Sequence, residues 1–171
     1  RFSALSDVLV LVVTFVLTVV FDLVVAIAVG LVLAAVLFMK RMSDVTSVRR
    51  WNPQNDMKYG KAIPNGTVVY EINGPMFFAD ADKFLDFSLE DNTKCVILRM
   101  SNVPSIDATA MKNIELLLTV CKSRNVTLLL SHVNPFPMTV IKKSGFYEKA
   151  GDACFVENID VALKTAEEIC K

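Results

Sequence analysis

The feature that most constrains this chain is a long apolar run near its N-terminus. From Val8 to Met39 the run has 32 residues, and Asp22 is its only ionisable side chain. A straight helix of that length would measure about 48 Å, whereas the hydrocarbon core of a bilayer is about 30 Å thick. One span needs about 20 residues, and two need about 40 plus a turn. The length therefore predicts two short transmembrane segments, at about residues 8–21 and 23–39, broken or sharply bent around Asp22.

The position of Asp22 leaves two interpretations open. A carboxylate is costly in lipid, so its side chain should face protein or water. It either caps the second helix or sits at the membrane interface, or it is a functional intramembrane acid that takes part in ion movement. Gly30, further along the run, would let a neighbouring helix approach closely.

Basic residues follow the apolar run. Lys40, Arg41, Arg49 and Arg50 fit the excess of Lys and Arg on the cytoplasmic side of membrane segments. They are candidates for contact with anionic lipid headgroups at the membrane surface.

The remaining composition argues against several classes of protein. The chain has 18 basic and 18 acidic residues, which leaves no basic stripe for nucleic acid. Its four cysteines form no C-x-x-C pair, and its single histidine, His132, has no acid–base partner nearby in sequence. We therefore expect no metal site, no cofactor, no catalytic residues and no enzymatic activity.

The sequence after the apolar run divides into a connector and a globular part. Residues 1–42 are assigned to the membrane segments, 43–64 to a linker containing Asn52-Pro53 and Ile63-Pro64, and 65–171 to a soluble domain. Apolar and β-branched runs alternate there with amphipathic stretches, which predicts an α/β fold with parallel strands. The expected strands cover residues 67–73, 95–100, 126–130 and 154–156, and the expected helices cover 80–89, 108–122, 135–144 and 158–170.

Two segments resemble a known family. The loop Val103-Pro104-Ser105-Ile106-Asp107-Ala108-Thr109-Ala110 resembles the signature loop of STAS domains, and the likeness extends from about Thr67 to Ile169. The upstream segment Thr14-Phe15-Val16-Leu17-Thr18, with Asp22-Leu23 and Gly30, resembles the last membrane segments of SulP anion transporters. In that family a STAS domain directly follows the final helix.

The resemblance implies both a fold and a function. The fold would be an α/β STAS domain, with a mixed sheet and helices from alternating β-α units, preceded by a transmembrane helical segment. The function would be the C-terminal part of a secondary active transporter of sulfate or a related anion such as bicarbonate or a dicarboxylate. The transporter would be a multi-pass protein of the cell (inner) membrane and a homodimer, with a cytoplasmic STAS domain in a regulatory or assembly role. Its substrate pocket would lie in preceding transmembrane helices, so no substrate-binding residue is expected here.

The signature loop itself departs from the pattern of anti-sigma antagonists. Asp107 matches the aspartate of that pattern, but Ala108 stands where the phosphorylated serine would be, which leaves Thr109 as a substitute. A helix N-terminus favours negative charge, so Ser105, Asp107, Ala108 and Thr109 are candidates for binding a protein partner, a nucleotide or an anion. The other interpretation is that Asp107 only caps the helix.

An alternative to transport remains open at this stage. The chain would then be a membrane-tethered STAS signalling module, which binds a protein or nucleotide partner and transports nothing. A soluble binding protein is a third interpretation, and the exposed apolar run argues against it.

Overall fold

A computed structural model describes residues 5–20, 22–51, 63–77 and 91–171. These residues form two compact units, Arg1–Asp44 and Val45–Lys171. The helix expected at residues 80–89 and most of the expected linker, residues 52–62, lie outside the described residues.

The first unit is a pair of helices. Helix α1 covers Leu5–Val20 and helix α2 covers Leu23–Val45. Asp22 belongs to neither helix, and its carbonyl accepts a hydrogen bond from the Ala26 amide at 3.0 Å. Asp22 therefore lies between the end of α1 and the start of α2. Helix α2 runs six residues beyond the expected end at residue 39, because Lys40 and Arg41 are themselves good helix formers.

Small side chains bring α1 and α2 together. A Cβ atom added at Gly30 would lie only 2.7 Å from the Thr14 hydroxyl oxygen, and Ala26 is completely buried. Most of the larger apolar side chains of both helices remain exposed, among them Leu11, Phe15, Val19, Val24, Leu31 and Phe38. The helices among the described residues all fall short of the length and apolar character that crossing a membrane requires. A membrane location for residues 8–21 and 23–39 therefore stays a prediction.

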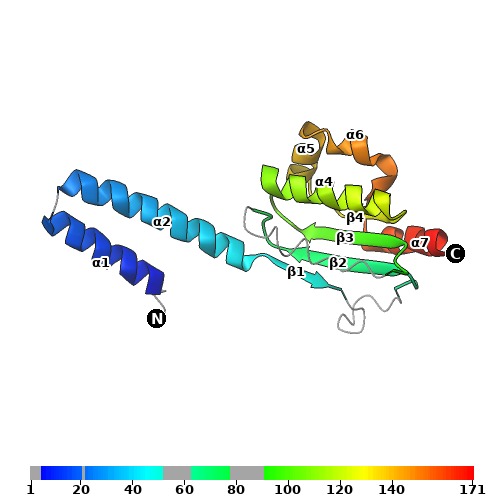
Figure 1. The fold of residues 1–171 in the computed structure, drawn as a ribbon, viewed down its shortest axis with the longest axis horizontal. Helices are drawn as coiled ribbons and strands as arrows, with labels where there is room; N and C mark the ends of the chain where they lie inside the picture. The colour runs from blue at the N-terminus through cyan, green and yellow to red at the C-terminus, as the bar shows by residue number, and fades with distance from the viewer. Residues whose placement is uncertain (1–4, 21, 52–62, 78–90) are drawn as a thin grey trace. The chain divides into compact units, whose positions relative to one another are not determined.

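The second unit is built on a five-stranded mixed sheet in the order β1-β2-β3-β4-β5 (Figure 1). The strands are β1 Ser47–Arg50, β2 Thr67–Asn73, β3 Cys95–Asn102, β4 Thr127–Ser131 and β5 Phe155–Val156. Strands β2 to β5 pair in parallel, and β1 pairs antiparallel with β2. The mixed α/β sheet expected from the sequence is confirmed.

Strand β1 lies inside the segment that was predicted to be a linker. Its sequence, Ser-Val-Arg-Arg, is too short and too polar to show the alternation of a half-buried strand. Pairing with β2 supplies the hydrogen bonds that the local sequence does not signal, with Val48 opposite Ile72 and Arg49 opposite Glu71. Trp51 continues this edge, is buried, and donates its amide to the Val69 carbonyl at 2.8 Å.

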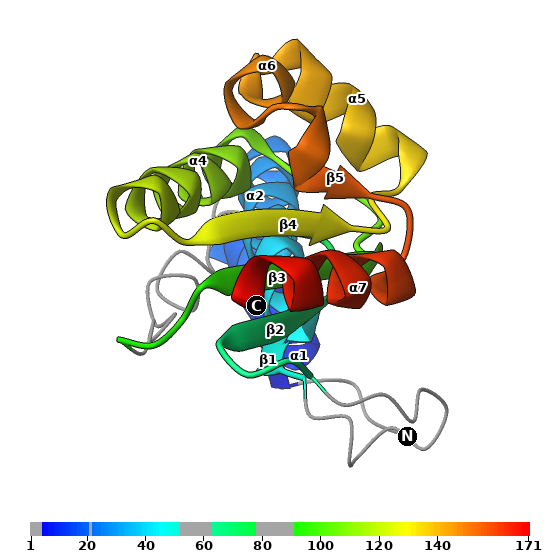
Figure 2. The same ribbon diagram turned by 90° about the vertical axis from the view of Figure 1, so that its right-hand side faces the viewer.

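Helices cover both faces of the sheet, as Figures 1 and 2 show. Side chains of β2, β3 and β4 alternate between two apolar clusters, as the two-residue period of a strand requires. One cluster includes residues of α4 Ala108–Ser123, α5 Pro135–Lys143 and α6 Phe146–Ala150. The other includes Trp51 and residues of α7 Ile159–Cys170. The helices predicted at 108–122, 135–144 and 158–170 are confirmed, whereas α6 was not predicted.

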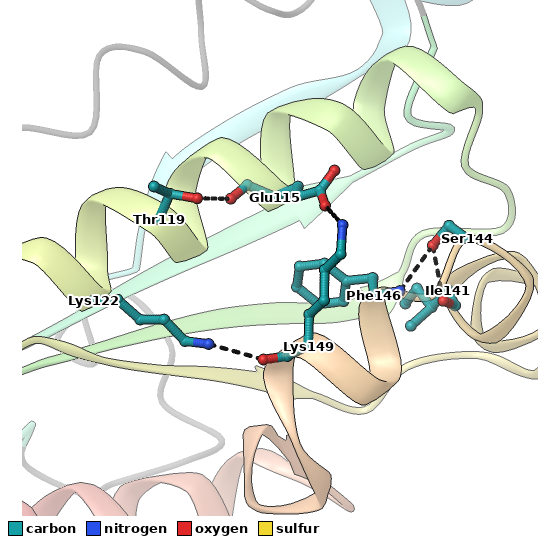
Figure 3. A network of polar contacts seen from close by, with 7 residues as sticks. All are labelled: Glu115, Thr119, Lys122, Ile141, Ser144, Phe146 and Lys149. Carbon is teal, nitrogen blue, oxygen red and sulfur yellow. Dashed lines mark hydrogen bonds and ion pairs between the residues drawn. The ribbon is translucent and has the colours of Figure 1, made fainter.

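Polar contacts fasten α6 to α4, as Figure 3 shows. The Lys149 ammonium pairs with the Glu115 carboxylate, and the Lys122 ammonium donates to the Lys149 carbonyl at 2.8 Å. Because both lysines are exposed, such contacts contribute little stability. Phe146, which is 1% exposed, anchors α6 in the core, so packing holds this five-residue helix in place.

Burial of three cysteines predicts a pattern of thiol reactivity. Desolvation raises the pKa of Cys95 and Cys154 to about 12 and that of Cys121 to about 11, and Cys170 is partly exposed. We expect iodoacetamide at pH 8 to modify Cys170 alone in the native protein and all four cysteines in denaturant. Peptide mass spectrometry would locate the labels, and rapid native labelling of Cys95 would contradict the packing.

Since the folded-state pKa values of Cys95, Cys121 and Cys154 are raised, these thiols should also lower the stability of the fold as the pH rises above about 9.

Candidate functional site

Three loops meet at one edge of the sheet. Strands β2, β3 and β4 run parallel, so their carboxyl ends point the same way and their following loops start at a common edge. In α/β proteins this is the edge where ligands usually bind. The predicted signature loop, residues 103–110, is the one that follows β3.

Backbone hydrogen bonds join the loop after β2 to the signature loop. The Met76 amide donates to the Ser105 carbonyl at 3.0 Å, and the Asp107 amide donates to the Met76 carbonyl at 3.1 Å. Met76 and Ile106 thus form an isolated parallel bridge, and both side chains are buried. The segment that follows β2 therefore holds the backbone of the signature loop on one side.

Asn134 joins the loop after β4 to the same segment. Its side-chain amide nitrogen donates to the carbonyls of Ser101 at 3.0 Å and Val103 at 2.8 Å, with the Met100 carbonyl at 3.5 Å. The sequence places Asn134 only as a residue before Pro135, and nothing in its spacing pointed to these acceptors. A side-chain amide bonded to a loop 31 to 34 residues away becomes visible only in the folded structure.

The predicted loop residues lie around the N-terminus of α4. Asp107 is the N-cap, and its carboxylate Oδ1 accepts a hydrogen bond from the Ala110 amide at 2.8 Å. Ala108 is exposed, and Ser105 and Thr109 are partly buried. Asp107 therefore caps α4, while binding of a partner, nucleotide or anion by these four residues stays a prediction.

The other predicted residues lie elsewhere in the chain. Asp22 is exposed between α1 and α2. Lys40 and Arg41 belong to α2, where their side chains are outside the described residues. Arg49 and Arg50 are exposed on β1, and as consecutive strand residues they point to opposite faces of the sheet.

A polar row that the sequence did not predict crosses β2, β3 and β4 toward their carboxyl ends. Arg99 on β3 pairs with Glu71 on β2 at 2.9 Å, and their side chains are 12% and 15% exposed. Ser131 on β4 is opposite Arg99 in register and is fully buried, and its hydroxyl lacks a hydrogen-bond partner among the described residues. Sequence reasoning missed this row because only the strand register brings the three residues together.

The described part of the chain offers no arrangement for metal chemistry. No group of three His, Cys, Asp or Glu side chains that could hold a metal ion occurs among the described residues. At the carboxyl edge, hydrogen bonds join the loops after β2, β3 and β4 beside the capped N-terminus of α4. Such a surface suits recognition of another molecule.

With this geometry in place, the family of the chain can be stated. The sequence model of the STAS domain matches residues 60–163, and the chain belongs to the STAS domain family. Among curated proteins, the chain is 31% identical over 158 residues to YvdB of Bacillus subtilis, which carries the name of a sulfate transporter; this covers 91% of the chain and 29% of that protein. It is 29% identical to the chloroplastic sulfate transporter 4.1 of Arabidopsis thaliana over 65% of the chain and 18% of the relative. The chain thus spans less than a third of either relative.

Solved structures show the same fold. A sulfate transporter family protein from Wolinella succinogenes is 36% identical, with a TM-score of 0.61 over 70% of this chain and 98% of that one. The SulP transporter STAS domain from Vibrio cholerae is 26% identical, with a TM-score of 0.54 over 64% of this chain and 88% of that one. The murine Solute Carrier 26 family member A9 anion transporter is 18% identical, with a TM-score of 0.75 over 97% of this chain and 29% of that one, a likeness of fold alone.

The capping role of Asp107 can be tested by substitution. Asp107→Ala removes the acceptor for the Ala110 amide and should cost about 1 kcal/mol of stability. Asp107→Asn keeps a side-chain oxygen acceptor and should cost much less, because asparagine caps helices about as well. Urea denaturation followed through Trp51, the single tryptophan, would measure both changes. Equal losses in the two variants would show that the charge, not the acceptor, stabilises the loop.

Proposed function

We propose that the chain is the C-terminal part of a secondary active sulfate or related anion transporter. The observation that carries the proposal is the match to YvdB, which covers 91% of the chain and so extends through both units. A tethered signalling domain would need only the STAS unit to resemble transporters. The likeness of fold to the murine anion transporter also covers both units.

The surface of the first unit supports a membrane location. Leu31, Val19 and Val24 are about 70% exposed, and most of the large apolar side chains around them are exposed too. Leaving so much apolar surface in water is costly, at about 25 cal/mol for each Å². We therefore infer that lipid and other helices of the transporter cover α1 and α2. Asp22, between the two helices, is our candidate for an acid that faces protein or water within the membrane.

The proposed role of the STAS unit is regulation or assembly of the transporter on the cytoplasmic side. The hydrogen-bonded loops and the capped N-terminus of α4 provide a surface for a protein, nucleotide or anion. The proposed transporter is a homodimer. Sulfate is the first candidate substrate because both curated relatives are named for it, with bicarbonate and dicarboxylates as the related class.

Uptake of labelled sulfate by the full-length protein would test the transport proposal. The protein should be reconstituted into liposomes and compared with a version truncated after Asp44. We expect saturable uptake by the full-length protein, competition by unlabelled sulfate, and a clear reduction after truncation. Bicarbonate and a dicarboxylate would be tried as competitors. If the protein is correctly inserted and moves none of these anions, the tethered signalling module becomes the better interpretation.

The basic residues give a second testable part of the proposal. We propose that Arg49 and Arg50, whose side chains leave opposite faces of the edge strand β1, flank its outer edge and hold this edge near anionic headgroups, together with Lys40 and Arg41 in the full chain. Each basic residue close to such a surface contributes about 1 kcal/mol. The double change Arg49→Gln and Arg50→Gln in residues 45–171 should weaken binding to phosphatidylserine vesicles by about tenfold or more. Lys112→Gln on α4, also exposed, is the matched control. Cosedimentation at two salt concentrations would measure binding, and equal binding by the double variant would exclude this role.

A further inference from the structure

An open pocket of about 300 Å³ lies at the carboxyl ends of β4 and β5. Its volume is at the lower end of the range for small-molecule sites, so it suits a compact ligand. The pocket is separate from the signature loop and was not anticipated from the sequence. Its lining comes from the loop after β4, from α5, and from β5 and the residue after it: His132, Val133, Met138, Phe155, Val156 and Glu157.

One wall of the pocket is apolar and already in place. Phe155 stacks on Tyr147 with ring centroids 4.7 Å apart, and Phe146 meets its ring edge-on at 6.4 Å. These two contacts fix the Phe155 ring before any ligand arrives. Met138, in the first turn of α5, supplies a flexible and polarizable side chain that can adapt to a ligand's shape.

The rim of the pocket is polar. The His132 amide donates to the Val156 carbonyl at 3.0 Å, which places His132 beside the residue that precedes Glu157. His132 has a φ of +54°, a left-handed conformation that few residues other than glycine adopt. Among the described residues that line the pocket, Glu157 is the only one with a carboxyl group.

We propose that this pocket binds a small alkylammonium cation. Its methyl groups would contact Val133, Met138 and Phe155, while its positive charge would lie near the Glu157 carboxylate. A neutral apolar ligand would partly dehydrate the Glu157 carboxylate without compensating its charge, and an anion would be repelled. The chemistry of the lining therefore selects for a cation that carries its own apolar surface.

Choline is a suitable probe because it is compact and highly soluble. The full chain would be kept in a maltoside detergent, which has no choline headgroup, with 13C-labelled methionine methyl groups observed by NMR. We expect choline to shift the Met138 methyl signal saturably and to leave Met111, which is buried in the core, unchanged. The neutral isostere 3,3-dimethylbutan-1-ol should bind more weakly.

Two variants make the test specific. Glu157→Gln keeps the shape of an exposed side chain and should weaken choline binding by about threefold or more, the scale of one partly exposed charge pair. Glu168→Gln removes an exposed acid from α7, which does not line the pocket, and should leave binding unchanged. The proposal is overturned if Met138 does not respond to choline, if the neutral isostere binds equally well, or if Glu157→Gln binds choline like the unchanged chain.

Discussion

The parallel pairing of β2, β3 and β4 in sequence order is the constraint on which the second unit depends. Strands that run parallel and lie in chain order begin all their following loops at one edge. The side chain of Asn134 and the bridge between Met76 and Ile106 can then join three loops that are distant in sequence. Without this arrangement the signature loop would have no neighbours to hold its backbone. The conformation of the signature loop therefore depends on the sheet topology rather than on the sequence of the loop itself.

Those parts of the fold that local physics determines were predictable from the sequence. Helix α4 shows a clear apolar stripe and a capping aspartate, and β3 is a continuous buried run apart from Arg99. Strand β1 and helix α6 were missed, because β1 takes its hydrogen bonds from β2 and α6 is held by packing around Phe146. The Asp107 cap was foreseen from its position, whereas the Asn134 bonds, the pairing of Arg99 with Glu71 and the pocket beside His132 depend on contacts between distant segments.

At the α4 N-terminus, Asp107 and Ala108 limit the chemistry that the signature loop can offer a ligand. The Asp107 carboxylate already satisfies the Ala110 amide, and Ala108 offers neither a hydroxyl nor a charge. A ligand at this helix end would have to share the site with the Asp107 carboxylate. The pocket at β4 and β5 lies elsewhere on the sheet and has Glu157 on its rim. This carboxylate favours cationic ligands.

Strand β1 also bears on where the domain physically begins. The family match starts at residue 60, yet Ser47–Arg50 pair along β2 and Trp51 lies buried in the core. A polypeptide cut at residue 60 would leave the β2 backbone groups that face β1 unpaired, and an apolar cavity where the Trp51 indole had been. An uncovered strand of that kind readily recruits a strand from another molecule. The isolated domain should therefore be produced from a start before Ser47. A shorter version would expose the edge of β2 that β1 covers, and this edge would promote self-association.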